Sequence, residues 1–106
     1  MLEKAFQASL IKDIKKEFPK SIVLKNDPNY IQGFPDLLVL YKDKWAALEC
    51  KQKDNSHKQP NQDYYINILG KMSYASFINP KNKEEVINEL HQAFGTRRNA
   101  RVSKRK

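Results

Sequence analysis

Two apolar segments on either side of a short charged turn constrain the fold more than any other part of this sequence. Residues 34–41 and 45–51 are rich in Leu, Val and aromatic side chains, and Lys-Asp-Lys lies between them. Such a pattern predicts two strands joined as an antiparallel hairpin. Each segment also carries one carboxylate at the end away from the turn, Asp36 in the first and Glu49 in the second.

The length of the turn decides whether these two carboxylates share a face. A loop of two residues (42–43) or of four (41–44) would place Asp36 directly opposite Glu49, with Cβ atoms about 4.5–5.5 Å apart. Because side chains alternate along a strand, Lys51 would join Glu49 on that face and Cys50 would point away. An odd loop or a bulge would break this arrangement, and the sequence alone leaves that alternative open.

Two facing carboxylates repel each other unless a cation or a proton lies between them. Carboxylate oxygens suit Mg²⁺ or Mn²⁺, which lower the pKa of a bound water and screen charge on a phosphate. We therefore expect Asp36 and Glu49 to bind metal, and Lys51 to orient the nucleophile or to stabilise the pentavalent phosphate. The alternative is a surface hairpin with ordinary solvated charges, but here the acidic residues interrupt apolar strands.

Further residues could complete such a site. The main-chain carbonyl of Cys50 is a candidate metal ligand, whereas its thiol is expected in the core. Glu3 would add an oxygen ligand if the first helix packs across the sheet edge, although an interaction with the helix N-terminus would explain it too. Gln62 could hydrogen-bond a phosphate or the metal-bound water, and Lys53 and Lys58 could bind phosphate. Simple solvation is the alternative for all three.

Positive charge is concentrated at the C-terminal end. The 106 residues carry a net charge of +8, and the six basic residues of segment 95–106 leave +2 for residues 1–94. We expect one domain over residues 1–94 and a basic, disordered tail over 95–106 that binds DNA phosphates through Arg97, Arg98 and Arg101. A solubilising terminus, or a remnant of a longer protein, is the alternative for this tail.

Apolar periodicity and turn residues predict three helices and four strands. A hydrophobic residue every fourth position predicts a helix over residues 2–18. Strands are expected at 21–25, 34–41, 45–51 and 74–78, and helices at about 60–70 and 82–94. Asn82 and Glu85 form a capping-box pattern for the last helix, which Gly95 would end. The order α-β-β-β-α-β-α predicts an α/β fold with a mixed central sheet flanked by helices.

Several classes of protein are disfavoured by what the sequence contains. No apolar run approaches the length of a membrane span, and no glycine-rich motif predicts a nucleotide cofactor. Cys50 is the single cysteine, which excludes an internal disulfide and fits a reducing cytoplasm.

The segment GFPDLLVL…WAALECK resembles the signature of the PD-(D/E)xK nuclease superfamily, and most closely that of small phage nucleases of the virus-type replication-repair (VRR-NUC) family. The resemblance covers roughly residues 1–94 and includes further motifs in the same order. These are the helix-opening Glu3, the Lys25-Asn26 pair, Gly33-Phe34-Pro35-Asp36, Glu49-Cys50-Lys51, Pro60-Asn61-Gln62, the strand YASF and Pro80.

This resemblance implies a restriction-endonuclease-like fold and Mg²⁺- or Mn²⁺-dependent cleavage of DNA. In family terms Asp36, Glu49 and the Cys50 carbonyl would hold the metal and Glu3 would complete it. Lys51 would be the catalytic lysine, and Gln62 an accessory polar residue. Compact phage members are similar to Holliday-junction resolvases, which act as homodimers because two symmetric nicks need two sites. A phage-encoded protein would work in the cytoplasm of its bacterial host.

We therefore expect a metal-dependent, structure-selective DNA endonuclease, in particular a phage Holliday-junction resolvase that acts as a homodimer on branched DNA. One alternative is a nicking or restriction-like endonuclease that cleaves duplex or flapped DNA. Another is a DNA-binding module without catalysis, against which the intact Asp36, Glu49 and Lys51 argue. An RNA-binding adaptor would rest on the basic tail alone.

Overall fold

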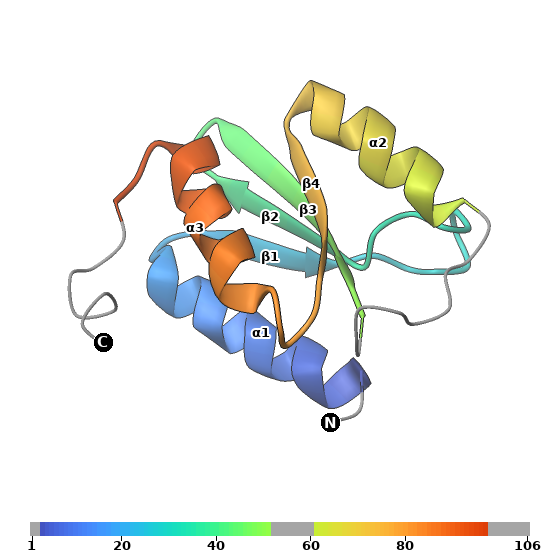
Figure 1. The fold of residues 1–106 in the computed structure, drawn as a ribbon, viewed down its shortest axis with the longest axis horizontal. Coiled ribbons are helices and arrows are strands. Elements are labelled where there is room, and N and C mark those ends of the chain that lie inside the picture. Colours follow the sequence, from blue (N-terminus) through green and yellow to red (C-terminus); the bar gives the residue numbers. More distant parts are fainter. Residues whose placement is uncertain (1–2, 52–60, 98–106) are drawn as a thin grey trace.

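The computed structural model describes residues 3–51 and 61–97, without the side chain of Glu3. Its elements, in chain order, are α1 (Glu3–Glu17), β1 (Ile22–Lys25), β2 (Leu37–Tyr41), β3 (Lys44–Cys50), α2 (Gln62–Met72), β4 (Tyr74–Ile78) and α3 (Lys83–Phe94) (Figure 1). This order confirms the predicted α-β-β-β-α-β-α arrangement. Within these ranges, every helix is too short or too polar to cross a lipid bilayer.

The four strands form one mixed sheet in the order β1-β2-β3-β4. β2 pairs antiparallel with both β1 and β3, whereas β4 pairs parallel with β3. A parallel neighbour requires a crossover connection, and α2 lies within the connection from β3 to β4. The mixed central sheet predicted from the sequence is therefore present.

The β2–β3 hairpin has the shorter of the two predicted loops. Tyr41 pairs with Lys44, so the turn contains only Lys42 and Asp43. Lys42 adopts a φ of 56°, a conformation that tight hairpin turns require at their first position. β2 begins at Leu37, later than predicted, because Pro35 has no N–H to contribute to a strand ladder.

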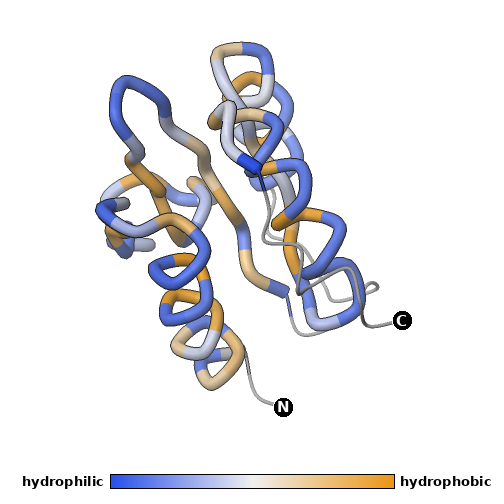
Figure 2. Tube along the Cα trace, turned by 90° about the vertical axis from the view of Figure 1, so that its left-hand side faces the viewer, coloured by the Kyte–Doolittle hydropathy of each residue, from blue (hydrophilic) through white to orange (hydrophobic). Residues whose placement is uncertain are grey.

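One face of the sheet carries the hydrophobic core beneath α1 and α3. Both helices lie over this face (Figure 1). The predicted stripe of α1 is buried there, together with the inward side chains of the strands and of α3. Along the helices, hydrophobic positions alternate with hydrophilic ones, as amphipathic packing requires (Figure 2). The core comprises Phe6, Leu10, Ile14, Phe18, Leu37, Val39, Ala46, Leu48, Cys50, Ile78, Val86, Ile87, Leu90 and Phe94.

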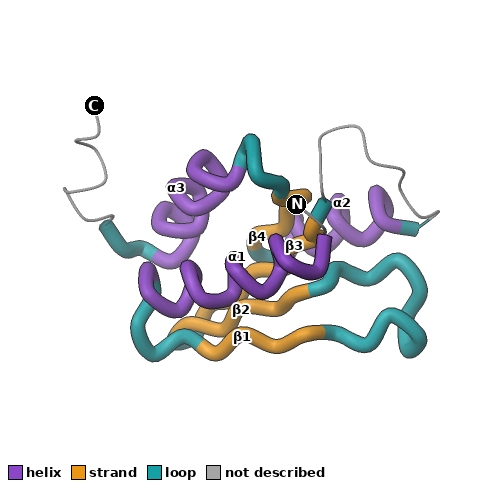
Figure 3. Tube along the Cα trace, turned by 90° about the horizontal axis from the view of Figure 1, so that it is seen from below, coloured by secondary structure: helices purple, strands orange, loops and turns teal. Residues whose placement is uncertain are grey.

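The opposite face is only partly covered. α2 buries Gln62 and Leu69, and the neighbouring positions Ala47, Glu49 and Lys51 of this face are buried as well. On the β1–β2 side, Ile22 is 57% exposed and Leu24 is 44% exposed. Figure 3 shows α1 and α3 on one side of β1 and β2, and none of the described helices on the other. On this face of the sheet, the β3 side is covered by α2 and holds polar groups, whereas the β1–β2 side is open and apolar.

The ends of α3 confirm one prediction and correct another. Gly95 ends the helix in a left-handed conformation, and Thr96 N–H donates to the His91 carbonyl (2.9 Å), as a glycine stop requires. The predicted capping box is wrong, although Asn82 does take the N-cap position. Its side chain makes no cap bond because Oδ1 accepts from Asn79 N–H and Nδ2 donates to the Phe77 carbonyl.

His91 joins α3 to α1. Its Nε2 lies 2.8 Å from Glu17 Oε1, and its Nδ1 lies 2.6 Å from Thr96 Oγ1. The imidazole also packs on Phe18, with ring centroids 4.3 Å apart. These contacts satisfy both ring nitrogens inside the protein, so the role of His91 is structural.

Candidate active site

Asp36 and Glu49 lie at the same end of the hairpin, on the face opposite the hydrophobic core. Leu37 pairs with Leu48, so one further step of the same register places Asp36 opposite Glu49. Asp36 is half-buried and Glu49 is 3% exposed. The two-residue turn therefore brings these carboxylates together, as its even length predicts.

Hydrogen bonds cross between the two strands at this point and fix both carboxylates. The N–H of Asp36 donates to Glu49 Oε1 (3.2 Å), and the N–H of Cys50 donates to Asp36 Oδ2 (2.9 Å). Each side chain is thus held by the main chain of the opposite strand. A pair held in this way stays close despite its mutual repulsion, which is the preorganisation that a cation-binding site needs.

Gln62, the first residue of α2, contacts the site from the helix that covers this face of the sheet. Its Nε2 donates to Glu49 Oε2 over 2.6 Å, and its side chain is only 6% exposed. The alternative of a solvated helix residue is therefore wrong. Both carboxylate oxygens of Glu49 accept hydrogen bonds, Oε1 from the main chain of Asp36 and Oε2 from the first residue of α2.

Lys51 lies on the same face as Glu49, as strand alternation predicts. Its Nζ is 3.9 Å from Glu49 Oε2, and the residue is 7% exposed. Lys51 N–H donates to the Ile78 carbonyl (2.8 Å), which ties its main chain to the end of β4. The Cys50 side chain is fully buried in the core on the other face, so only its main chain can serve the site.

Burial dominates the electrostatics of Asp36. Removal from water raises the pKa of this carboxyl above its ordinary value, while the Cys50 N–H and the charge of Lys51 act in the opposite direction. A buried carboxylate is costly unless it is paired or bound to a metal. The perturbed Asp36 beside a second carboxylate and a lysine is the pattern expected of a functional site.

The donor set fits a hard divalent cation. Asp36 and Glu49 supply carboxylate oxygens, the ligand type that Mg²⁺ and Mn²⁺ prefer. No cluster of three or more His, Cys, Asp or Glu side chains occurs in residues 3–51 and 61–97. Two carboxylates are nevertheless enough for Mg²⁺, which commonly keeps several water ligands.

Glu3 is the first residue of α1, and its side chain lies outside the described part. Figures 1 and 3 both show the N-terminal end of α1 beside the C-terminal end of β3. The main chain at Glu3 therefore begins near this end of the sheet. The role of Glu3 as a ligand remains a prediction.

Asn26 supports the site in a way that the sequence did not specify. Its Nδ2 donates to the Pro35 carbonyl (2.8 Å), and its N–H donates to the Asp36 carbonyl (2.8 Å). Both bonds hold the main chain that carries Asp36. The only signal in the sequence was the Lys25-Asn26 pair within the family resemblance, which carried no mechanism.

Gly33 lets the loop before Asp36 approach the start of α2. It has a φ of 86°, and a Cβ added there would lie 2.5 Å from Asn61 Cβ. No L-residue with a side chain fits both the conformation and the space. This close approach sets the helix that begins at Gln62 against the loop that leads to Asp36.

Of the candidate DNA-binding cations, only Arg97 lies within the described residues. Lys53, Lys58, Arg98 and Arg101 lie outside the described residues. Arg97 is exposed and follows α3, whose C-terminal end lies across the molecule from the start of β2 and the end of β3 (Figure 1). A DNA contact by Arg97 would therefore be remote from Asp36 and Glu49.

Comparison with known proteins gives one informative similarity. The sequence matches no protein-family model, and no curated protein matches it. A solved structure described as a VRR_NUC domain protein matches with a TM-score of 0.65 over 90% of this chain and 89% of the other. Their sequences are 20% identical, so the similarity establishes a shared fold.

Proposed function

We propose that this protein is a metal-dependent DNA endonuclease of the VRR-NUC type. One observation carries the proposal: Asp36 and Glu49 are held together by hydrogen bonds, beside the buried Lys51, in a fold shared with a VRR_NUC domain protein. The residues match the order and spacing of the PD-(D/E)xK motif, and a structural hairpin would not need a buried carboxylate that faces a half-buried one.

Asp36, Glu49 and the Cys50 carbonyl would hold Mg²⁺ or Mn²⁺, with Glu3 as a further ligand. When bound, such an ion lowers the pKa of a coordinated water and offsets negative charge on the phosphate. The ammonium group of Lys51 would donate to a phosphate oxygen and stabilise the charge that develops in the transition state. Gln62 would hold Glu49 in the orientation that the site requires, since it donates to Oε2.

We further propose that the protein acts as a homodimer and that its substrate is branched DNA. Ile22 and Leu24 pair with Leu40 and Leu38, so the open half of the sheet presents one continuous apolar strip. Exposed apolar surface of this kind is typical of protein interfaces, and a two-fold dimer is the commonest assembly. A dimer built on this strip would supply the two sites that symmetric cleavage of a four-way junction requires.

The test is cleavage of a labelled synthetic four-way junction by the purified full chain, with Mg²⁺ or with EDTA, beside linear duplex of the same sequence. Symmetric nicks in the junction that require Mg²⁺ would support a dimeric resolvase. Cleavage of the duplex as well would favour a nicking or restriction-like endonuclease. Tight binding without cleavage of either DNA would contradict the enzymatic proposal and favour a DNA-binding module.

A further inference from the structure

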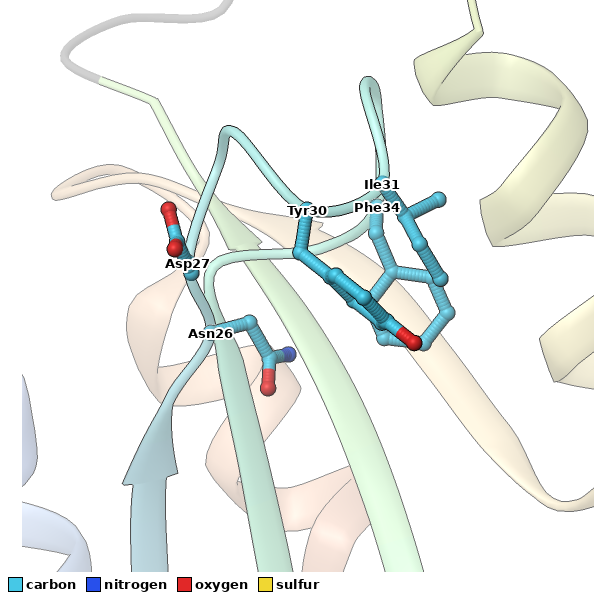
Figure 4. Close-up of a pocket in the computed structure, with 5 residues that line it drawn as sticks. All are labelled: Asn26, Asp27, Tyr30, Ile31 and Phe34. Atoms are coloured by element: carbon cyan, nitrogen blue, oxygen red, sulfur yellow. The ribbon is translucent and has the colours of Figure 1, made fainter.

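A hollow with aromatic walls lies next to the candidate active site. It has a volume of about 350 Å³ and is lined by Asn26, Asp27, Tyr30, Ile31 and Phe34. Figure 4 shows the side chains of Tyr30, Ile31 and Phe34 gathered on one side, and Asn26 and Asp27 at the other. Tyr30 is 84% exposed, so its ring contributes little to the stability of the fold and is available to a ligand.

Asn26 links the hollow to the segment that carries Asp36. It lines the hollow and also donates both hydrogen bonds that hold the main chain at Pro35 and Asp36. Phe34 lies two residues before Asp36, a separation of about 7 Å in an extended chain. Successive phosphates of one DNA strand advance by about 3.4 Å along the helix axis, so the hollow is within about two nucleotides of a phosphate at Asp36.

The chemistry of the walls selects a flat, uncharged ligand with polar edges. Tyr30 and Phe34 offer aromatic surface, and the Phe34 ring is itself supported by Tyr65 with centroids 5.3 Å apart. Asp27 is the charged residue of the lining, and its Oδ1 accepts the Asn29 N–H. A carboxylate repels phosphate but accepts hydrogen bonds from the amino groups of bases, so a nucleobase fits the hollow better than the DNA backbone.

We propose that this hollow binds a single unstacked nucleobase of the DNA, with the ring of Tyr30 as its stacking surface. The inference rests on the proposed function, because the substrate is then a DNA strand with a phosphate at Asp36. A base inside a duplex is stacked between its neighbours and is not free to enter. Flaps and branch points have unstacked bases, and the hollow would therefore contribute to selectivity for such structures.

The test uses the full chain and DNA binding in EDTA, so it does not depend on cleavage. The probe is a fluorescein-labelled flapped duplex, intact or with one abasic nucleotide at each of three positions on either side of the branch. Tyr30→Ala is compared with Tyr30→Phe, which keeps the ring. Met72→Ala is the matched control, because Met72 is 67% exposed at the far end of α2 from Gln62.

Tyr30→Ala should weaken binding of the flapped DNA about 5- to 150-fold, the range expected for loss of one base–aromatic stack. Tyr30→Phe and Met72→Ala should bind like wild type, and binding of continuous duplex should be unchanged in every variant. At one position the abasic nucleotide should weaken wild type by the same factor and Tyr30→Ala no further, because both changes remove the same contact.

Additive losses from Tyr30→Ala and every abasic position would overturn the proposal. An altered mass of Tyr30→Ala in solution would also overturn it, because the hollow would then belong to a protein interface. The outcome is separable from that of the proposed function. DNA cleavage in Mg²⁺ with no effect of Tyr30→Ala on flap binding would refute the base site alone. The expected abasic coupling without any cleavage would support the base site and refute the nuclease.

Discussion

The side-chain amide of Gln62 donates a 2.6 Å hydrogen bond to Glu49 Oε2, which joins the start of α2 to the end of β3. Both residues are less than 7% exposed. The other carboxylate oxygen, Oε1, accepts from the Asp36 N–H, so both oxygens of Glu49 are hydrogen-bonded. The orientation of this carboxylate is therefore set by groups that would not themselves bind metal.

Loss of this amide should impair cleavage more than DNA binding. We expect Gln62→Ala to lower the single-turnover cleavage rate about 10- to 100-fold, the usual effect of removing a group that orients a metal ligand. The dissociation constant for DNA in EDTA should remain that of wild type, because phosphate contacts do not require the carboxylate. A rate equal to that of wild type would show that Glu49 needs no support from α2.

Asp36 should destabilise the metal-free protein at neutral pH. Burial raises the pKa of its carboxyl in the folded state above the ordinary value of 3.8. As pH rises from that value through the raised pKa, the unfolded chain loses its proton first, so the free energy of unfolding falls. Below pH 3.8 both states are protonated, and the penalty is absent.

Asp36→Asn removes this charge and should therefore raise the Tm at pH 7 in EDTA. The difference from wild type should shrink at pH values below 3.8. Millimolar Mn²⁺ should raise the Tm of wild type and have little effect on the variant, because a ligand stabilises only the state that binds it. A variant that melts below wild type at pH 7 in EDTA would contradict this interpretation of Asp36.

Gly33 should tolerate no side chain. Gly33→Ala would place Cβ 2.5 Å from Asn61 Cβ at a φ of 86°, and we expect a loss of about 1–3 kcal/mol in the free energy of unfolding. Gly70 is a matched control because a Cβ there meets no atom within 4 Å. Gly70→Ala lies in a helix and should stabilise by about 0.5–1 kcal/mol. Urea unfolding measures both, and equal effects would show that the close approach of Gly33 to Asn61 is unimportant.

The sequence predicts those features of the site that depend on the spacing of residues within one strand, turn or helix. The facing of Asp36 and Glu49 follows from strand alternation and an even turn, both of which can be counted along the chain. The buried face of α1 follows from the spacing of Phe6, Leu10 and Ile14 in the same way.

Contacts between separate segments could not be predicted from residue spacing. The approach of Gly33 to Asn61 and the hydrogen bonds from Asn26 to Pro35 and Asp36 depend on how a loop folds back on the sheet. The capping box failed for a different reason, which is local competition. The Asn82 side chain binds the Phe77 carbonyl at the end of β4 and the Asn79 N–H, and no propensity of the helix itself reveals that competition.

The basic C-terminal segment should add affinity for any DNA. Deleting residues 98–106 removes Arg98, Arg101, Lys104, Arg105 and Lys106 and keeps Thr96, which contacts His91. The slope of log K against log salt should become shallower by about 0.9 for each phosphate contact that is lost. Affinity titrations over a range of NaCl concentrations measure this slope. A slope equal to that of the full chain would show that the segment makes no phosphate contacts.

The most direct test of the central claim compares cleavage with binding in Asp36→Ala and Lys51→Met. Asp36→Ala removes a proposed metal ligand, and Lys51→Met keeps the length of the side chain without its charge. We predict that wild type cuts labelled branched DNA in Mg²⁺, that Asp36→Ala does not, and that Lys51→Met is slower by at least about 10²-fold. In EDTA, Asp36→Ala should bind the DNA as tightly as wild type, and Lys51→Met should lose no more affinity than one phosphate contact provides. Cleavage by either variant at the wild-type rate would place the active site elsewhere.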